Sequence, residues 1–217
     1  MLVGCTALPK PATPPARAIA TSTHPAMLAI PDETMVFTVA FRGVTLARTT
    51  TTVGRAGEIA GHRAVIVKSG GHTEGILSII GDLRWELTTT LDLDDGRPLE
   101  AIEESWGTFN GHVEHERSTI RGHRLDLHAA ITLLRAWHPR PDERQKVDLE
   151  IGGGRFSLDV WLGAREKLRM PALRFDGIAG EKFPFSIWIS DDADRVPLRA
   201  RVQTEWGEVG VELVDYD

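Results

Sequence analysis

Residues 83–93 read L-R-W-E-L-T-T-T-L-D-L, and this stretch decides the fold class. Its odd positions carry Leu, Trp or Thr, whereas its even positions carry Arg, Glu, Thr or Asp. Side chains alternate between the two faces of a β-strand, so a period of two places the apolar residues on one face. The stretch therefore predicts an antiparallel strand that covers a core on one side and meets solvent on the other.

The same alternation returns along most of the chain after residue 35, interrupted by turn signals. Asn110-Gly111 is the strongest of these signals, because both central positions of a tight hairpin turn favour positive φ. We count roughly ten strands and predict a mainly β domain, a curled antiparallel meander that forms a half-barrel or an open barrel. The other alternating stretches are residues 37–41, 147–151, 156–162, 183–189 and 198–206, and further turns are expected at residues 94–96, 152–154 and 191–194.

One segment breaks this pattern, since residues 126–137 read D-L-H-A-A-I-T-L-L-R-A-W with apolar residues at helical spacing. Asp126 can cap the N-terminus of a helix, and Pro139 ends the run. We predict one α-helix packed on the concave face of the sheet. At the level of fold, this arrangement is analogous to lipoprotein carriers of the LolA and LolB type, which hold acyl chains. The apolar helix positions are Leu127, Ala130, Ile131, Leu134 and Trp137.

Composition excludes several classes of protein. The 217 residues are 41% hydrophobic and 26% charged, so the chain can bury a core, and the formal net charge of −6 argues against a nucleic-acid partner. No apolar run approaches the roughly 20 residues that span a bilayer. The single cysteine excludes an internal disulfide and a Cys-rich zinc site. No nucleotide-binding or hydrolase motif occurs, so we predict no cofactor.

The N-terminus predicts a lipid anchor. Leu2-Val3-Gly4-Cys5 resembles the lipobox of bacterial lipoproteins, in which the chain is cut before the cysteine and the thiol is acylated. Only Met1 precedes this box, whereas a signal needs a basic and an apolar region upstream, so either the true start lies further upstream or the match is chance and the location is unknown. With that signal, the protein would be exported, would face the periplasm and would be held at the membrane only through Cys5.

The chain divides into three parts. Residues 1–5 are the remnant of a lipoprotein signal. Residues 6–32 hold six of the twelve prolines with many Ala and Thr, a composition that predicts an extended, flexible linker. Residues 33–217 form a single β-rich domain.

Three further groups of residues resemble a bacterial envelope family known as domain of unknown function 3108. Members have an Asp-Pro-Leu-Ser-Ala-like helix start followed by Arg, and a C-terminal Trp-x-Ser-x-Asp turn followed by Arg-x-Pro. Leu127 and Ala129 depart from the helix motif. The resemblance implies an exported, lipid-anchored protein without an established activity. The matching positions, to which we assign structural roles, are Gly43 in the first hairpin, Asp126, Ala130 and Arg135 at the helix, and Trp188, Ser190, Asp192, Arg195 and Pro197 near the C-terminus.

Two clusters could bind a metal, but a simpler interpretation is favoured for each. His112, Glu114, His115 and His123 flank the Asn110-Gly111 turn. On a strand His112 and Glu114 point away from His115, so at most two ligands converge, whereas zinc needs three or four. We therefore predict a solvated hairpin and no metal.

An acidic loop raises the alternative of calcium. Asp191, Asp192 and Asp194 lack the length and the distal Glu of an EF-hand loop. Carboxylates in such a loop also bond local backbone N–H groups, so we favour a simple turn in which Asp192 and Arg195 can pair.

Arg135 ends an otherwise apolar helix, and a charge there must reach solvent or meet a carboxylate. Asp126 lies about 13 Å away along the helix axis, so a partner would come from a strand. The alternative is that Arg135 contacts the acidic head group of a ligand. Most of the six tryptophans are expected to pack in the core or at its rim; they are Trp85, Trp106, Trp137, Trp161, Trp188 and Trp206.

Three hypotheses for the function follow. The first is an envelope lipoprotein that binds or carries a lipid or another apolar ligand without catalysis. The second is a structural or assembly accessory of the envelope that acts through a protein partner. The third, which ranks last, is a metal-dependent hydrolase that uses the histidine hairpin or the aspartate loop.

Overall fold

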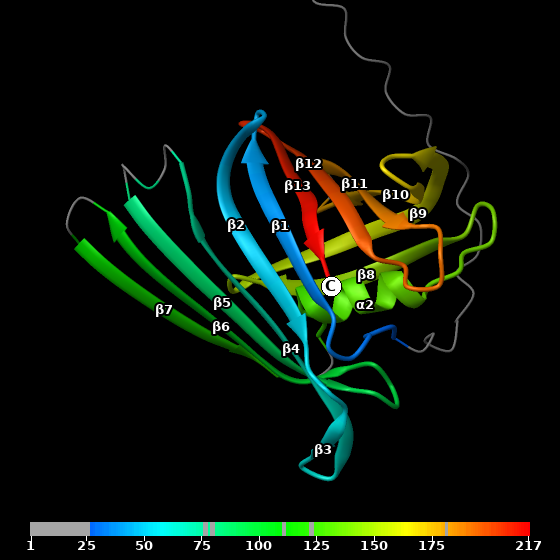
Figure 1. The fold of residues 1–217 in the computed structure, drawn as a ribbon, viewed down its shortest axis with the longest axis horizontal. Helices are drawn as coiled ribbons and strands as arrows, with labels where there is room; N and C mark the ends of the chain where they lie inside the picture. The colour runs from blue at the N-terminus through cyan, green and yellow to red at the C-terminus, as the bar shows by residue number, and fades with distance from the viewer. Residues whose placement is uncertain (1–26, 76–77, 79–80, 110–111, 122–123, 181) are drawn as a thin grey trace, which may run out of the picture.

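The protein is described by a computed structural model covering residues 27–75, 78, 81–109, 112–121, 124–180 and 182–217. In these residues the chain forms one antiparallel sheet of thirteen strands, which curls into a nearly closed barrel, and one helix, α2, that lies inside the curl (Figure 1). The mainly β, antiparallel class predicted from the period of two is confirmed. The strands are β1 (Thr34–Phe41), β2 (Val44–Val53), β3 (Gly57–Ile59), β4 (His62–Thr73), β5 (Gly81–Asp92), β6 (Pro98–Phe109), β7 (His112–Ile120), β8 (Arg144–Ile151), β9 (Gly154–Lys167), β10 (Pro171–Ala179), β11 (Phe183–Ser190), β12 (Pro197–Thr204) and β13 (Gly207–Tyr216).

The predicted count of roughly ten strands is too low. Strand β3 has three residues and pairs only with β4, and β2 contains four consecutive threonines at 49–52, so neither shows the alternation used for counting. The twelve strands of the main path run in the order β7-β6-β5-β4-β2-β1-β13-β12-β11-β10-β9-β8. Pairing of β1 with β13 joins the two ends of the domain at the middle of the sheet.

The barrel is also more closed than the predicted half-barrel. Strands β7 and β8 are the edges of the sheet, and contacts beside them bridge the seam. Leu125 forms a parallel bridge with Leu149 of β8. Glu103 of β6 accepts a hydrogen bond from the backbone N–H of Gly152, 2.7 Å away, in the β8–β9 turn. These contacts hold the two edges together without a continuous ladder.

Helix α2 (Leu127–Ala136) begins as predicted, because the Asp126 carboxylate accepts a hydrogen bond from the backbone N–H of Ala129 at 2.8 Å. It crosses the concave face and packs against both halves of the sheet (Figure 1). Ala129, near its N-terminus, belongs to one core cluster with Val53, Val65, Val67 and Leu91. Its C-terminal end, with Leu134 and Trp137, belongs to another with Val160, Leu173, Phe175, Phe185 and Ile189.

Residues 27–32, which the sequence analysis places in the linker, contact the folded domain. Leu28 donates a backbone hydrogen bond to the carbonyl of Thr132 at 3.1 Å, and Met27 Sδ accepts one from the Thr132 hydroxyl at 2.9 Å. Met27 and Ala29 pack against the core beside Ala129. The first described residues therefore cover one side of α2.

The turns predicted at residues 94–96, 152–154 and 191–194 are confirmed, whereas further turns lie at 60–61 and at 205–206, where the alternating stretch 198–206 is interrupted after Thr204. The β1–β2 turn has positive φ at Arg42 and Gly43, and the β8–β9 turn has positive φ at Gly152 and Gly153. Strands β6 and β7 pair as far as Phe109 and His112. Asn110 and Gly111, between them, lie outside the described residues, as does Cys5.

Candidate functional site

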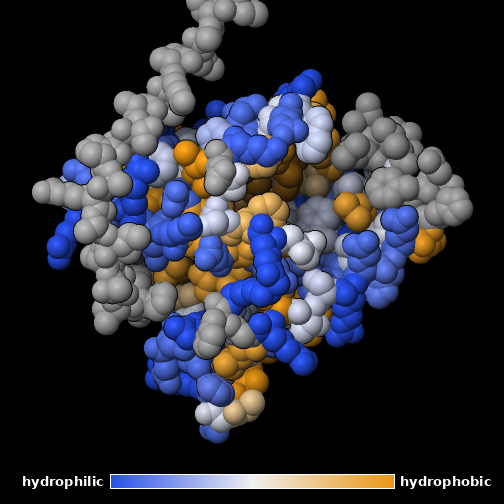
Figure 2. All heavy atoms as spheres, turned by 180° about the vertical axis from the view of Figure 1, so that it is seen from behind, coloured by the Kyte–Doolittle hydropathy of each residue, from blue (hydrophilic) through white to orange (hydrophobic). Residues whose placement is uncertain are grey.

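A cavity of about 840 Å³ lies on the concave side of the sheet, between α2 and the strands. This volume falls within the roughly 300–1,000 Å³ of typical ligand sites. Figure 2 shows the molecule from behind, with hydrophobic side chains gathered in its middle and hydrophilic side chains around them. The cavity has two chemically different walls.

The first wall is apolar and is built by β1, β13, β12 and β11. Val39 pairs with Val211, Val211 with Ala200, and Ala200 with Ile187, so this row of side chains crosses four neighbouring strands on one face. Phe37 lies two residues before Val39 on the same face, and all five side chains border the cavity. This wall offers a continuous surface to an alkyl chain.

Helix α2 adds further apolar surface. Leu127 and Ile131 border the cavity, and 44% of Leu127 is exposed. Ile151, at the end of β8, also borders the cavity and is 38% exposed. The sequence analysis assigned Leu127 and Ile131 to the packed face of the helix, whereas buried positions include the polar residues His128 and Thr132. Part of the predicted core stripe is therefore left available to a ligand.

The second wall carries hydroxyl groups on β2, β4, β6 and β7. Thr51 and Ser69 pair across β2 and β4, and their hydroxyl oxygens are 2.7 Å apart. Thr49, Ser105 and Ser118 border the same side of the cavity. Hydroxyl groups on a partly apolar surface fix the orientation of a ligand through hydrogen bonds.

A chain of hydrogen bonds leads from this wall into the protein interior. Ser69 Oγ is 2.7 Å from His128 Nε2, and His128 Nδ1 is 2.8 Å from Thr89 Oγ1. The Thr89 hydroxyl donates to the Asp126 carboxylate. Thr89 must then accept from Nδ1–H, which leaves Nε2 to accept from Ser69. We call these four residues the hydroxyl–imidazole relay.

Burial sets the charge of this relay. It lowers the pKa of His128 to about 4 and raises the pKa of Asp126. His128 is therefore neutral at neutral pH. In a Ser-His-Asp triad the imidazole bonds the carboxylate directly, whereas Thr89 lies between them here, and an imidazole with so low a pKa is a weak general base. The geometry favours a role in anchoring α2 to β4 and β5.

Arg135 lies at the other end of α2, in a buried ion pair. Its Nη1 and Nη2 atoms lie 2.6 and 2.8 Å from the two carboxylate oxygens of Glu33, the residue before β1, and Nη2 also donates to the Asp194 carbonyl at 2.7 Å. The side chains of Arg135 and Glu33 are each 1% exposed. Arg135 borders the cavity, but its charge is already compensated there.

Arg195 completes this end of the helix. Its guanidinium donates to the carbonyl oxygens of Arg135 and Trp137, the latter at 2.8 Å. Cations stabilise the exposed carbonyls at a helix C-terminus. We call Glu33, Arg135 and Arg195 the ionic lock.

The remaining motif positions lie in turns, in strands β11 and β12, and in helix α2. Asp192 Oδ1 accepts from the Ser190 hydroxyl and from the backbone N–H groups of Asp194 and Arg195, and its carboxylate forms no side-chain pair with Arg195. Trp188 Nε1 donates to Glu166 at 2.8 Å. Further positions are Gly43 in the β1–β2 turn, Pro197 at the start of β12, and Ala130, whose N–H bonds the Asp126 carbonyl.

The candidate metal ligands do not converge in the described residues. Within that part of the chain no group of three or more His, Cys, Asp or Glu side chains could hold a metal ion. The His115 ring stacks on Trp106, with ring centroids 5.3 Å apart, and Glu114 is exposed. His123 lies outside the described residues, and nothing is assigned to the side chain of His112.

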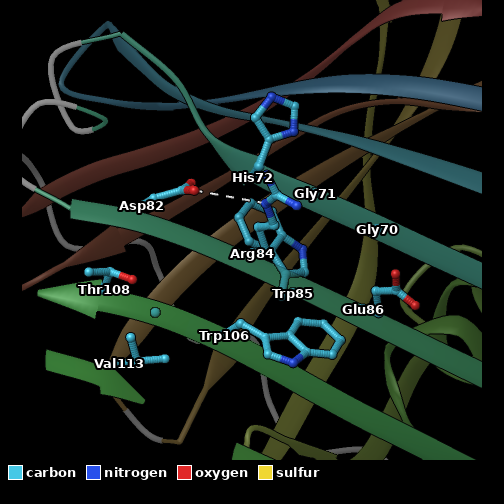
Figure 3. Close-up of a pocket in the computed structure, with 11 residues that line it drawn as sticks. Gly70, Gly71, His72, Asp82, Arg84, Trp85, Glu86, Trp106, Thr108 and Val113 are labelled. Carbon is cyan, nitrogen blue, oxygen red and sulfur yellow. Dashed lines mark ion pairs between the residues drawn. The ribbon is translucent and has the colours of Figure 1, made fainter. Parts of the chain in front are cut away.

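A second concavity, of about 710 Å³, lies on the outer face of β4, β5 and β6 (Figure 3). Gly70 and Gly71 leave β4 without side chains there, while Arg84 and Trp106 pair on the face opposite the buried Leu87. Most of its other lining residues are charged or polar. It offers less apolar surface than the inner cavity, which is therefore the candidate functional site.

Comparison with solved structures supports the fold and assigns no function. No family model matches the chain, and no curated protein matches it by sequence. A β-barrel-like protein of domain of unknown function 1849 from Brucella abortus is similar in structure, with a TM-score of 0.60 and 8% identity over 88% of this chain and 99% of that one. This protein thus has a β-barrel-like fold already seen in a domain without an assigned function.

Two more distant structures have lower scores. A Bacteroides fragilis protein described as a candidate exported protein with a YmcC-like fold gives a TM-score of 0.39, with 8% identity over 89% of this chain and 99% of that one. A candidate lipoprotein from Parabacteroides distasonis gives 0.37, with 6% identity over 91% and 100%. Such scores carry no argument about fold or function.

In the described residues, no helix has the length and apolarity needed to cross a membrane.

Sequence reasoning missed the relay residues Ser69, Thr89 and His128, as well as Glu33. A usable signal was present for Ser69 and Thr89, because each is a polar residue at a position where the period of two would place a residue against the core, whereas His128 lies off the predicted apolar stripe of the helix. Glu33 carried no such signal.

Proposed function

We propose that this protein is a non-catalytic binding or carrier protein for a lipid-like amphiphile, which occupies the cavity between α2 and the sheet. The observation that carries the proposal is the apolar surface left open inside the barrel by Leu127, Ile131 and Ile151. Burial of such surface stabilises a complex by about 25 cal/mol per Å². An alkyl chain along the apolar wall would cover these side chains.

The proposed location is the bacterial envelope. The lipobox-like Leu2-Val3-Gly4-Cys5 and the proline-rich stretch after it support an exported protein anchored through an acylated Cys5. We also propose kinship with domain of unknown function 3108, on the residues that resemble its motifs. The analogy with LolA and LolB concerns the fold and gives only weak support for function.

Binding of the neutral dye N-phenyl-1-naphthylamine to the full chain tests this function. We expect dye fluorescence to rise on binding, and unlabelled amphiphiles to reverse the rise. Leu127→Gln should weaken dye binding several-fold, since it places an amide in the cavity. Val44→Gln is the matched control, because Val44 is 53% exposed and does not border the cavity. Absence of dye binding, or an equal effect of both variants, would exclude the proposed cavity.

The alternative of an assembly accessory has one observation in its favour. Trp206 is 74% exposed in the β12–β13 turn, and its carbonyl accepts from Arg42 in the β1–β2 turn, close to the exposed Val44. Large exposed aromatic side chains are typical of binding hot spots for proteins. If this surface acts, crosslinking in cells should recover one envelope partner with the parent protein and lose it with Trp206→Ala.

A further inference from the structure

The cations that border the cavity are already paired. In the described part of the chain these are Arg117, Arg135 and Arg199. Arg117 lies 3.3 Å from Glu104, and Arg199 lies 2.7 Å from Glu212. Arg135 is held in the ionic lock by Glu33. An anionic head group entering the cavity would therefore have to displace an existing carboxylate to gain a cation.

Two carboxylates on the hydroxyl wall have no cationic partner among the described residues. Glu103 pairs in register with Leu87, whose buried side chain marks the inner face, and Glu116 pairs with Ser105, two residues further along β6. Within the described part of the chain, Glu103 accepts hydrogen bonds only from neutral groups, the Ser118 hydroxyl at 3.1 Å and the Gly152 N–H at 2.7 Å.

Glu116 forms no hydrogen bond or ion pair with any residue that the structure describes, and its side chain is exposed at the cavity border. Carboxylates at a cavity border repel an incoming anion, and binding sites use such repulsion to reject unwanted ligands. Carboxylates and hydroxyls together accept and donate hydrogen bonds, which suits a head group rich in hydroxyls.

Resting on the proposed function, we infer that the cavity selects amphiphiles whose head group donates hydrogen bonds and carries no negative charge, as in saccharide-headed or glycerol-headed lipids. The alkyl chain lies along the apolar wall of β1 and β11–β13. The head group lies at β6 and β7, where Glu103, Glu116, Ser105 and Ser118 face the cavity. Anionic amphiphiles such as fatty acids are rejected by the two carboxylates.

Displacement of N-phenyl-1-naphthylamine from the full chain tests this selection at pH 8. The competitors are dodecyl maltoside, dodecyltrimethylammonium and dodecanoate, which share a twelve-carbon chain and are used below their micelle concentrations. We expect dodecyl maltoside to displace the dye at about a tenfold lower concentration than dodecanoate. Dodecyltrimethylammonium, which lacks donors, should also displace it better than dodecanoate. Displacement by dodecanoate at an equal or lower concentration than dodecyl maltoside overturns the inference.

Variants then assign the selection to the two carboxylates. Glu103→Gln with Glu116→Gln keeps acceptor oxygens but removes two charges, and should improve dodecanoate binding about tenfold. Glu116→Gln alone, which has no contacts to lose, should produce part of this gain. The control, Glu58→Gln with Asp159→Asn, removes two charges away from the cavity lining and should leave the ranking unchanged. An equal gain in the control would show that only net charge matters.

The dye experiments distinguish failure of the carrier function from failure of the head-group selection. If the parent protein does not bind the dye at all, the proposed function is wrong. If it binds the dye but admits dodecanoate as well as dodecyl maltoside, the carrier function stands and the head-group selection is wrong.

Discussion

The two ends of helix α2 are both buried and polar, but they are built from opposite chemistry. The C-terminal end is the ionic lock, in which Arg135 and Glu33 pair directly and Arg195 binds the last helix carbonyls. The N-terminal end is the hydroxyl–imidazole relay, which is neutral at His128 and reaches the cavity through Ser69. The helix is thus fixed at one end by charge and at the other by hydroxyl groups.

The two ends of the helix are therefore expected to have different roles: the ionic lock stabilises the fold, and the hydroxyl–imidazole relay lies where a ligand can bind. Arg135 and Glu33 are buried and their charges compensate each other, and removing one of them leaves an uncompensated charge in the protein. Hydroxyls at a cavity border can exchange partners with water or with a ligand at small cost. We therefore expect loss of one lock residue to destabilise the fold, whereas the relay end is the one that a ligand can influence.

The largest expected loss of stability comes from a variant that breaks the ionic lock. Glu33→Ala leaves Arg135 buried without its carboxylate, and should lower the free energy of unfolding by about 3–5 kcal/mol. Urea unfolding followed by tryptophan fluorescence measures this loss. Arg55→Ala, which removes an exposed ion pair with Asp32, should cost at most about 1 kcal/mol.

A double variant sharpens the same test. Glu33→Leu with Arg135→Met replaces the charged pair by apolar side chains, and should be more stable than Glu33→Ala because no charge is left unpaired. If the double variant is as unstable as the single one, the loss comes from altered packing rather than from the ion pair.

A smaller effect belongs to the relay end and depends on pH. The pKa of His128 is lowered to about 4, against an ordinary value of 6.5, so between these values the unfolded chain binds a proton that the folded protein does not. This contribution is fully present above pH 6.5 and is lost as the pH falls toward 4, by about 3 kcal/mol in all. Unfolding midpoints from pH 7.5 to 4.5 measure it.

Replacing His128 isolates this contribution. His128→Gln should lower stability at pH 7 but flatten the dependence between pH 6.5 and 4.5. His115→Gln, at an exposed ring on the outer face, should leave the slope of the parent protein. An unchanged slope in His128→Gln would mean that the lowered pKa does not govern acid stability.

The contrast between local elements and long-range contacts explains which features could be predicted from the sequence. Strands and helix follow from local periods, so residues 83–93 and 126–137 were assigned correctly to β5 and α2. The lock joins residues 33 and 135, and the relay joins residues 69, 89, 126 and 128, so both depend on strand register and on where the helix crosses the sheet. Neither follows from a pattern within one window of sequence.

The smallest expected effects compare two steps within the relay. Thr89→Val removes the hydroxyl between His128 and Asp126 and leaves two buried polar groups without a partner, so it should cost about 1–3 kcal/mol in unfolding free energy. Ser69→Ala removes only the cavity-facing partner of His128, where water can replace the hydroxyl, so it should cost about 1 kcal/mol or less. Addition of dodecyl maltoside should then raise the unfolding midpoint of Ser69→Ala as it does that of the parent protein. Equal losses in the two variants would mean that Ser69 is sealed from solvent, and that the relay end is as closed as the lock.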